Sequence, residues 1–298
     1  MSASQAVVAP AQTGWRQVIA DYVALTKPKV QSLLLLTTVC TMEIAGDPSV
    51  GLIALTVVGG YLSAGGAGAV NHWYDRDIDA QMPRTANRPV PAGRVSPRAA
   101  LVYGCLLSLL SFVLLTATVN VLAASLAFSG FLGYVFVYTV WLKRRTPQNI
   151  VIGGAAGAIP PLVGWAAVTG GLGGMPLYLF AIVFFWTPPH FWALSLLMKD
   201  EYERVGVPML PVVRGEQETR KQILLYAVLL WAVTQLPFCA GGLGTAYLVS
   251  SLVLGGLFIA GAVVLYRRAD RRSALRLYLF SLAYLALLFG AMVIDVKL

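Results

Sequence analysis

The chain has 298 residues, of which 58% are hydrophobic and only 12% are charged, and its mean hydropathy is +0.73. A soluble domain of this size carries about twice that charged fraction, so the composition excludes an ordinary globular domain and indicates a polytopic membrane protein. A net charge of +9 is compatible with nucleic-acid binding and with positive cytoplasmic loops of a membrane protein. The distribution of the positive residues along the chain distinguishes the two.

Nine apolar segments are long enough to cross the hydrocarbon core of a bilayer as helices. In chain order they cover residues 30–44, 52–71, 99–116, 121–141, 150–169, 176–198, 223–240, 246–266 and 274–294. The first is short and spans the core only if Lys29 extends its side chain to the interface. We expect an all-α protein with nine transmembrane helices. Its cytoplasmic tail, residues 1–24, contains a short interfacial helix, and residues 25–298 form one domain.

The positive residues are distributed asymmetrically around these segments. With the N-terminus in the cytoplasm, Lys297 is the only one of the 22 Lys and Arg residues on the other side of the membrane. Positive residues favour the cytoplasmic side, so we predict a cytoplasmic N-terminus, an external C-terminus and no nucleic-acid partner. The first 30 residues lack a signal-peptide core and an Arg- and Ser-rich transit pattern, which favours a bacterial inner membrane.

A polar stretch over residues 71–97 follows the second apolar segment. Asn71, Asp75 and Asp79 are spaced four apart, so on an α-helix they face roughly one way. Carboxylates stacked at the end of a membrane helix repel one another unless a cation lies between them, and two carboxylates with an amide oxygen suit Mg²⁺. A solvated loop explains the arginines that follow but not this alignment. We therefore predict a Mg²⁺ site here, with both aspartates catalytic.

A second acidic loop follows the sixth apolar segment and begins with Lys199 and Asp200. Asp200, together with Glu201 or Glu203, is a candidate site for a second metal ion, and Asp200 and Lys199 are further catalytic candidates. Like the first polar stretch, this loop starts with acids, turns at prolines and reaches an Arg and Gly pair, which indicates a parallel internal repeat.

Basic side chains near both loops are suited to a diphosphate, because Arg and Lys neutralise phosphate and donate hydrogen bonds to it. The candidates for direct phosphate contact are Arg84, Arg88, Lys143, Arg145 and Lys199, and Arg94 and Arg98 lie in the same run as the first two.

An apolar bundle with a charged rim implies a substrate with a phosphorylated head and a lipid tail. A metal ion and positive side chains make diphosphate a good leaving group, and aromatic faces can shield the allylic cation that departs from it. The candidate aromatic residues are Trp73, Tyr74, Trp186, Phe191 and Trp192. His72 and His190 are intramembrane histidines, and for each the sequence leaves open a haem iron ligand or a helix contact.

The motif Asn71-x-x-x-Asp75-x-x-x-Asp79, followed by Arg84-Thr85-x-x-Arg88-Pro89, resembles the first signature of the UbiA superfamily of intramembrane prenyltransferases. Further motifs carry the resemblance at residues 25–28 (LTKP), 146–150 (TPQNI), 186–192 (WTPPHFW) and 206–211 (GVPMLP). It implies nine helices around a central cavity.

These motifs are similar to those of the branch that transfers a farnesyl group from farnesyl diphosphate to a vinyl group of haem B, with water added, giving haem O and diphosphate. The resemblance therefore implies one or two Mg²⁺ ions as cofactor and haem B as a substrate that contacts His190 and Trp192. It also implies membrane lipid and a downstream haem A synthase as partners.

One position departs from the superfamily pattern, which usually has a second Asp-x-x-x-Asp after the sixth helix. Here Asp200 is followed four residues later by Arg204, so the sequence leaves open whether a second metal ion binds, and Arg204 becomes a candidate for phosphate contact.

Three alternative functions remain: prenyl transfer to a quinone precursor or another aromatic acceptor, an ion-coupled transporter, and phosphotransfer between lipid alcohols. The acids lie at helix ends, whereas transporter sites lie near the midplane. The Asp-Gly and Ala-Arg pairs of the phosphotransfer motif are absent near Asp75.

Overall fold

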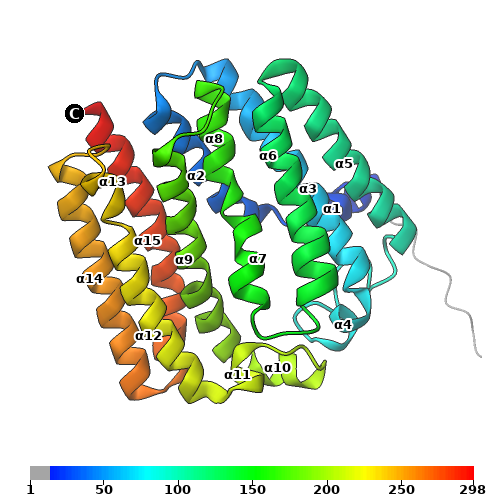
Figure 1. Ribbon diagram of the computed structural model, residues 1–298. Helices are drawn as coiled ribbons and strands as arrows, with labels where there is room; N and C mark the ends of the chain where they lie inside the picture. The colour runs from blue at the N-terminus through cyan, green and yellow to red at the C-terminus, as the bar shows by residue number, and fades with distance from the viewer. Residues whose placement is uncertain (1–13) are drawn as a thin grey trace, which may run out of the picture.

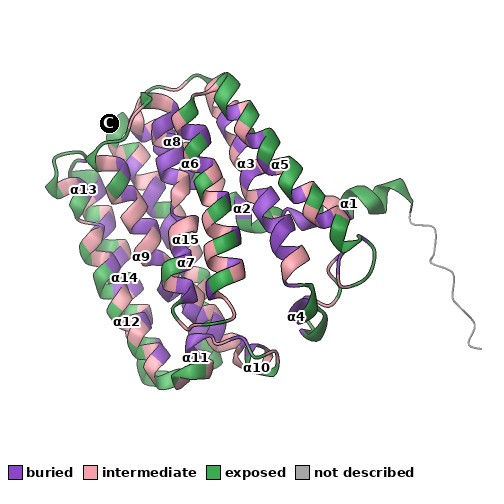
Figure 2. Ribbon diagram, turned by 45° about the vertical axis from the view of Figure 1, so that its right-hand side comes forward, coloured by how far each residue is buried: buried purple, intermediate pink, exposed green. Residues whose placement is uncertain are grey.

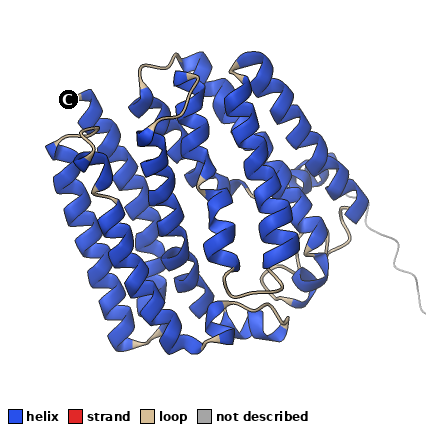
Figure 3. Ribbon diagram, viewed as in Figure 1, coloured by secondary structure: helices blue, strands red, loops and turns tan. Residues whose placement is uncertain are grey.

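Helices form every regular element of residues 14–298, the part of the chain that the computed structural model describes (Figure 3). In chain order they are α1 (Trp15–Leu25), α2 (Pro28–Ala45), α3 (Val50–Tyr74), α4 (Arg76–Gln81), α5 (Pro97–Thr118), α6 (Val121–Leu132), the π-helix η1 (Gly133–Leu142), α7 (Asn149–Gly157), α8 (Ile159–Thr169), α9 (Gly174–Leu197), α10 (Lys199–Arg204), α11 (Leu210–Val213), α12 (Gly215–Val233), α13 (Leu236–Cys239), α14 (Thr245–Arg268) and α15 (Arg271–Lys297).

The predicted all-α membrane class is confirmed, and each of the nine predicted segments corresponds to a helix or to two consecutive helices. Eight of these are long and apolar enough to cross a membrane. The remaining one is α2, which carries Lys29 and Glu43 and packs mainly against α8 and α15. Of the predicted tail, α1 lies where a short helix was expected, and residues 1–13 lie outside the described part.

The helices form an elongated bundle in which α12, α14 and α15 lie at one side and α3 and α5 at the other (Figure 1). Between them α9 packs against α12 and α15, and α2 packs against α8. The outward faces of the outer helices are rich in exposed leucine and valine (Figure 2), as expected of surfaces that contact lipid. The C-terminus lies at the end of the bundle opposite α4 and α10 (Figure 1).

Two glycines set the position of α3, the helix that carries the polar motif. A Cβ atom added to Gly66 would lie 2.5 Å from the carbonyl oxygen of Gly104 on α5, and one added to Gly104 would lie 2.7 Å from the carbonyl oxygen of Gly66. Small residues facing each other in this way allow membrane helices to approach backbone to backbone. The approach leaves no room for a side chain at either position.

Local breaks occur where the sequence supplies a reason. Pro160 and Pro161 lie in the first turn of α8, where proline is tolerated, and they separate α8 from α7 at Ala158. In contrast, α9 continues through Pro188 and Pro189. The π-helical turn of η1 is of a kind found often at functional sites.

The two loops predicted to be counterparts share a local structure. Each begins with a six-residue helix directly after a long membrane helix, α4 after α3 and α10 after α9. Both short helices lie at the same end of the bundle (Figure 1). This agrees with the predicted repeat in local structure and places the two acidic loops on one face of the protein.

Candidate active site

The polar motif keeps its helical spacing across the junction of α3 and α4. The backbone N–H of Asp75 donates to the carbonyl of Asn71 at 2.9 Å, and that of Asp79 donates to the carbonyl of Asp75 at 2.8 Å. The Asn71 amide Nδ2 also donates to Asp75 Oδ2 at 2.7 Å. All three residues are at most 3% exposed. The structure therefore brings Asn71 and Asp75 together as predicted, and it buries both carboxylates.

Each buried carboxylate is neutralised by a basic residue from another part of the chain. Asp75 Oδ2 forms an ion pair with Lys143, and its Oδ1 lies 3.5 Å from Arg144 Nη2. Asp79 Oδ2 pairs with Arg88 Nη1 at 2.7 Å. Such pairing offsets the cost of burying two carboxylates. Lys143 and Arg88 were both predicted at this site, whereas Arg144 was not.

Side-chain hydrogen bonds hold η1 and the segment after it in place. The Asn149 amide donates to the carbonyl of Lys143 at 3.2 Å, and Thr139 Oγ1 accepts from Asn71 Nδ2 at 3.2 Å. Arg144 also pairs with Asp77 at 2.7 Å, and its hydrogen bond holds the pKa of that carboxyl below the usual value. Arg145 is exposed, and its side chain forms no hydrogen bond or ion pair within residues 14–298.

The loop between α4 and α5 presents its arginines from a fixed backbone. The buried Thr85 hydroxyl donates to the carbonyl of Asp79 at 2.8 Å, and the backbone N–H groups of Arg94 and Val95 donate to the carbonyl of Pro89. Arg94 Nε lies 3.0 Å from the buried Asp21 of α1. Arg94 is thus committed to holding α1 against this loop.

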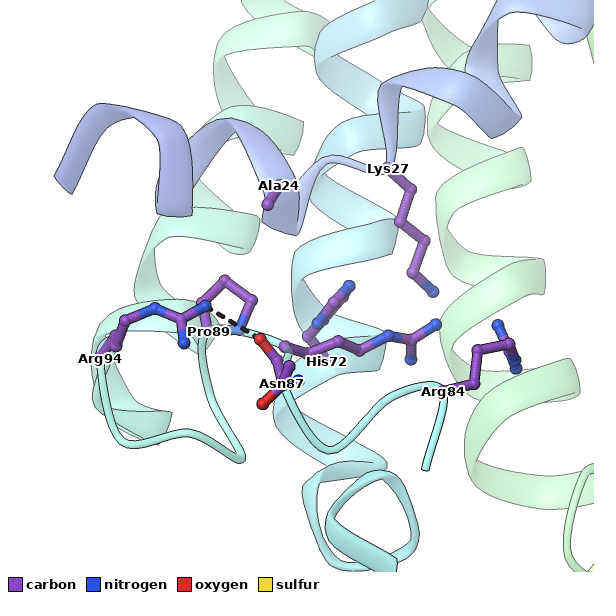
Figure 4. A pocket seen from close by; sticks show the side chains of 8 residues that line it. Ala24, Lys27, His72, Arg84, Asn87, Pro89 and Arg94 are labelled. Carbon is purple, nitrogen blue, oxygen red and sulfur yellow. Dashed lines mark hydrogen bonds between the residues drawn. The ribbon is translucent and has the colours of Figure 1, made fainter. Parts of the chain in front are cut away.

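A cavity of about 310 Å³ lies beside the motif, between this loop and the link from α1 to α2 (Figure 4). Its lining is strongly basic and comprises Ala24, Lys27, His72, Arg84, Asn87, Arg88, Pro89 and Arg94. Figure 4 shows Lys27 on the α1–α2 link, opposite the loop that carries Arg84, Asn87 and Arg94. Arg84 is exposed and has no ion-pair partner in the described chain. Positive side chains around an open space are the arrangement that binds a phosphorylated anion.

Lys27 lines this cavity, but it was not among the predicted site residues. Its backbone is in the left-handed region, with φ of +54°, which a non-glycine residue adopts only when its surroundings impose it. Its Nζ donates to Asn71 Oδ1 at 2.5 Å. Burial and the charges of Arg88 and Lys143 lower the pKa of Lys27 to about 7, although nearby carboxylates partly offset this. The positive charge at this site is therefore only partly neutralised by carboxylates of the protein.

Aromatic side chains also meet at this site. Lys27 Nζ lies 5.9 Å from the centre of the Tyr134 ring, and the Tyr134 and Tyr138 rings are 5.3 Å apart. Both tyrosines belong to η1. The predicted Trp73 and Tyr74 instead lie beneath the guanidinium groups of Arg76 and Arg144.

The acidic loop after α9 has its charged side chains at or near the protein surface. Asp200 and Arg204 are exposed, and Lys199 Nζ lies 3.4 Å from Glu216 at the start of α12. Within residues 14–298 no three His, Cys, Asp or Glu side chains form a group that could hold a metal ion. Asp200 and Glu201 therefore do not join Asp75 and Asp79 in one cluster.

Two features of α10 still connect it to the site. Glu201 Oε2 is buried and has no hydrogen-bond partner in the described part of the chain. Burial raises the pKa of Tyr202, and the charges of Lys143, Arg84 and Arg88 act against that rise, so α10 lies within electrostatic range of the basic residues.

His190 and Trp192 occupy helix–helix contacts. The His190 ring stacks on Trp186 at 4.3 Å and on Tyr278 of α15 at 5.0 Å, and its Nδ1 lies 2.6 Å from Ser281 Oγ. Trp192 packs edge-on against Tyr226 of α12 at 5.1 Å. The structure thus places both residues in the contacts of α9 with α15 and α12.

The model of the UbiA prenyltransferase family matches residues 33–288. The chain belongs to the UbiA prenyltransferase family. Among curated UbiA-type relatives, a protein named protoheme IX farnesyltransferase from Symbiobacterium thermophilum is 55% identical over 284 residues, which cover 94% of this chain and 95% of that protein. Proteins of the same name from Chloroflexus aurantiacus and Thermus thermophilus are 55% and 54% identical over 95% and 94% of this chain. The chain spans about half the length of these two relatives, 49% and 46%.

Solved UbiA-type structures share the fold at low sequence identity. A digeranylgeranylglyceryl phosphate synthase superposes with a TM-score of 0.78 at 19% identity, covering 95% of this chain and all of that one. A UbiA homolog from Archaeoglobus fulgidus, bound to DMAPP and Mg²⁺, superposes with a TM-score of 0.66 at 16% identity, covering 91% of this chain and 99% of that one. These two likenesses establish the UbiA fold.

Proposed function

We propose that this chain transfers a farnesyl group from farnesyl diphosphate to a vinyl group of haem B, with addition of one water molecule, giving the hydroxyfarnesyl product haem O and diphosphate. The observation that carries the proposal is the basic cavity beside a buried group of Asn71, Asp75 and Asp79. The near full-length likeness to the S. thermophilum protein supports the choice of acceptor and prenyl group.

The donor atoms of this group fit Mg²⁺. Two buried carboxylates and one amide oxygen are hard ligands, too few to enclose the ion, and Mg²⁺ typically completes its shell with waters and substrate phosphate. Asn71, Asp75 and Asp79 would hold the ion. When bound, Mg²⁺ withdraws charge from the diphosphate and so makes it a better leaving group. The A. fulgidus homolog with DMAPP and Mg²⁺ supports this assignment. A second ion at Asp200 and Glu201 is not part of the proposal.

The basic residues bind and orient the diphosphate. Lys27 and Arg88 both line the cavity, and Arg84 adds a third positive group with no ion-pair partner in the described chain. Lys143 and Arg88 already hold the carboxylates, so they are close enough to neutralise charge that develops on the departing diphosphate. Tyr134, next to Lys27, presents an aromatic face that can stabilise the allylic cation.

We also propose that residues 25–298 act as one domain in a bacterial inner membrane, with α4 and α10 at the cytoplasmic face. The positive residues in the loops at that end support this orientation. Membrane lipid supplies the farnesyl chain with an apolar environment, and a haem A synthase is the expected acceptor of the product.

The test is a product assay. Purified protein in detergent receives haem B, farnesyl diphosphate and Mg²⁺, and the extracted porphyrins are identified by mass. We expect a hydroxyfarnesyl adduct of haem that disappears with EDTA and returns when Mg²⁺ is restored. Prenylation of an aromatic acceptor without any haem adduct would move the function to another branch of the family. Failure to release diphosphate in the presence of any acceptor would contradict prenyl transfer.

A further inference from the structure

His72 is a buried residue whose polar atoms have no partner in the protein. It follows Asn71 on α3 and is 2% exposed. Its Nδ1 and Nε2 are both buried without a hydrogen-bond partner, and it is the only residue in positions 14–298 with two such side-chain atoms. A buried polar group without a partner destabilises the folded state. A histidine in this condition indicates a ligand that completes its hydrogen bonds.

The cavity shows the chemistry of that ligand. His72 lines it together with Lys27, Arg84 and Arg88, which are hydrogen-bond donors and carry positive charge (Figure 4). An uncharged imidazole offers one N–H donor and one acceptor nitrogen. Because the neighbouring side chains are donors, a ligand shared by all four residues must be rich in acceptor oxygens and negatively charged. Phosphate and carboxylate groups meet this description.

The second histidine of the chain gives the contrast. The Nδ1 atom of His190 is already bonded to Ser281, and its ring is stacked between Trp186 and Tyr278. Its Nδ1 atom and its ring faces therefore contact residues of α9 and α15. The sequence did not distinguish the roles of the two histidines. In the structure, only His72 lines the basic cavity, whereas His190 lies in a helix–helix contact.

We propose that His72 donates a hydrogen bond to an oxygen of the diphosphate of the prenyl substrate and does not ligate haem iron. The inference rests on the proposed function, which supplies the diphosphate. Two observations favour diphosphate over a haem carboxylate. The cavity adjoins the Asn71–Asp75 pair proposed to hold Mg²⁺, and its 310 Å³ suits a diphosphate better than a porphyrin. His72 thereby binds the leaving group, next to the metal site.

The experiment compares His72→Leu with His72→Gln and His72→Asn. Leucine removes the donor, glutamine places an amide N–H near the position of Nε2, and asparagine places one near that of Nδ1. Binding of inorganic diphosphate with Mg²⁺ to each purified full-length variant is measured by calorimetry, without haem. We expect the Kd to rise about 10- to 100-fold in the Leu variant, as for loss of a hydrogen bond to a charged group. One of the two amide variants should stay within a few-fold of wild type.

Thermal unfolding separates this role from a structural one. Because His72 lacks protein partners, the ligand-free Leu variant should melt at the wild-type temperature or higher, and only its stabilisation by diphosphate should shrink. A lower melting temperature without ligand would show that His72 is bonded within the protein and would overturn the proposal. An unchanged diphosphate Kd in the Leu variant would overturn it as well.

Haem binding distinguishes a diphosphate bound to His72 from a haem carboxylate bound there. It also separates the role of His72 from the proposed function. Titration of haem B, followed by its Soret band, should give the same affinity in the Leu variant as in wild type. Loss of haem affinity with diphosphate binding intact would assign His72 to haem instead. If wild type binds diphosphate but forms no haem adduct, the proposed function fails and the role of His72 stands. If wild type does not bind diphosphate, both fail.

Discussion

Removal of Lys143 is expected to destabilise the protein, because it leaves the Asp75 carboxylate buried with weaker compensation. The Asp75 side chain is 1% exposed and that of Lys143 is 14% exposed. Breaking a buried pair by removing one partner costs about 3–5 kcal/mol. Arg144 remains 3.5 Å from the other carboxylate oxygen, so for Lys143→Met we expect the lower end, about 3 kcal/mol. At about 2 °C per kcal/mol for a chain of this size, the melting temperature falls by about 6 °C.

The double variant Asp75→Asn/Lys143→Met should recover most of that loss, because it leaves neither charge buried without its partner. Melting temperatures of both single variants and the double variant in detergent, without Mg²⁺, measure the coupling energy, expected to be about 2 kcal/mol. Lys297→Met is the matched control. It breaks surface pairs with Asp47 and Glu43 and should not change the melting temperature measurably. Single-variant losses that simply add in the double variant would refute the ion pair. Activity should be absent from both variants that lack the Asp75 carboxylate.

Three further predictions concern the surroundings of the site. The lowered pKa of Lys27 means that the folded, ligand-free protein releases this proton near pH 7, whereas the unfolded chain keeps it up to about pH 10.5. Diphosphate raises this pKa again, so at pH 8 calorimetry in buffers of different ionisation enthalpy should detect proton uptake on binding, which Lys27→Arg abolishes. Gly104→Val should destabilise the protein by about 1–3 kcal/mol through overpacking and lower kcat, because the added Cβ meets Gly66 and Val70 on α3. An unchanged kcat and melting temperature would contradict the close approach of α3 and α5. Arg94→Gln leaves Asp21 buried without its ion-pair partner and should lower the stability by about 1–2 kcal/mol. This is less than for a fully buried pair, because Arg94 is one-third exposed. The readout is increased proteolysis near α1.

The membrane helices could be predicted from the sequence because their signal is local. A run of apolar residues long enough for the bilayer is visible without knowledge of its neighbours, and all nine segments proved helical. The breaks were harder to predict. The π-helical conformation of η1 was not predicted, and α2 is less apolar than the other spans because it carries Lys29 and Glu43.

The site could be predicted where its geometry follows from one helix and not where it depends on contacts across the chain. Asn71 and Asp75 meet because they are four residues apart. Lys27 reaches Asn71 from 44 residues away, through a left-handed backbone conformation that no local pattern announces. Likewise, the choice between Arg144 and Arg145 depends on which side chain the turn after η1 directs toward α4.

The second acidic loop contains a contact that sequence position does not reveal. Lys199 was predicted as a catalytic and phosphate-binding residue, and the structure places its Nζ 3.4 Å from Glu216 at the start of α12. The two residues are 17 positions apart and are brought together by the turn through α11.

The ligand-free site balances its charges in a way that constrains how a substrate can bind. Lys143 and Arg88 neutralise the two buried carboxylates, yet the same carboxylates are the proposed ligands of Mg²⁺. A metal ion arriving alone would displace these bases without giving them a new partner, because the cavity beside them is already lined by positive groups. If the metal arrives with diphosphate, each displaced base gains a phosphate oxygen, so the number of close charge pairs is preserved. Metal and diphosphate should therefore bind together, and each should bind weakly when the other is absent.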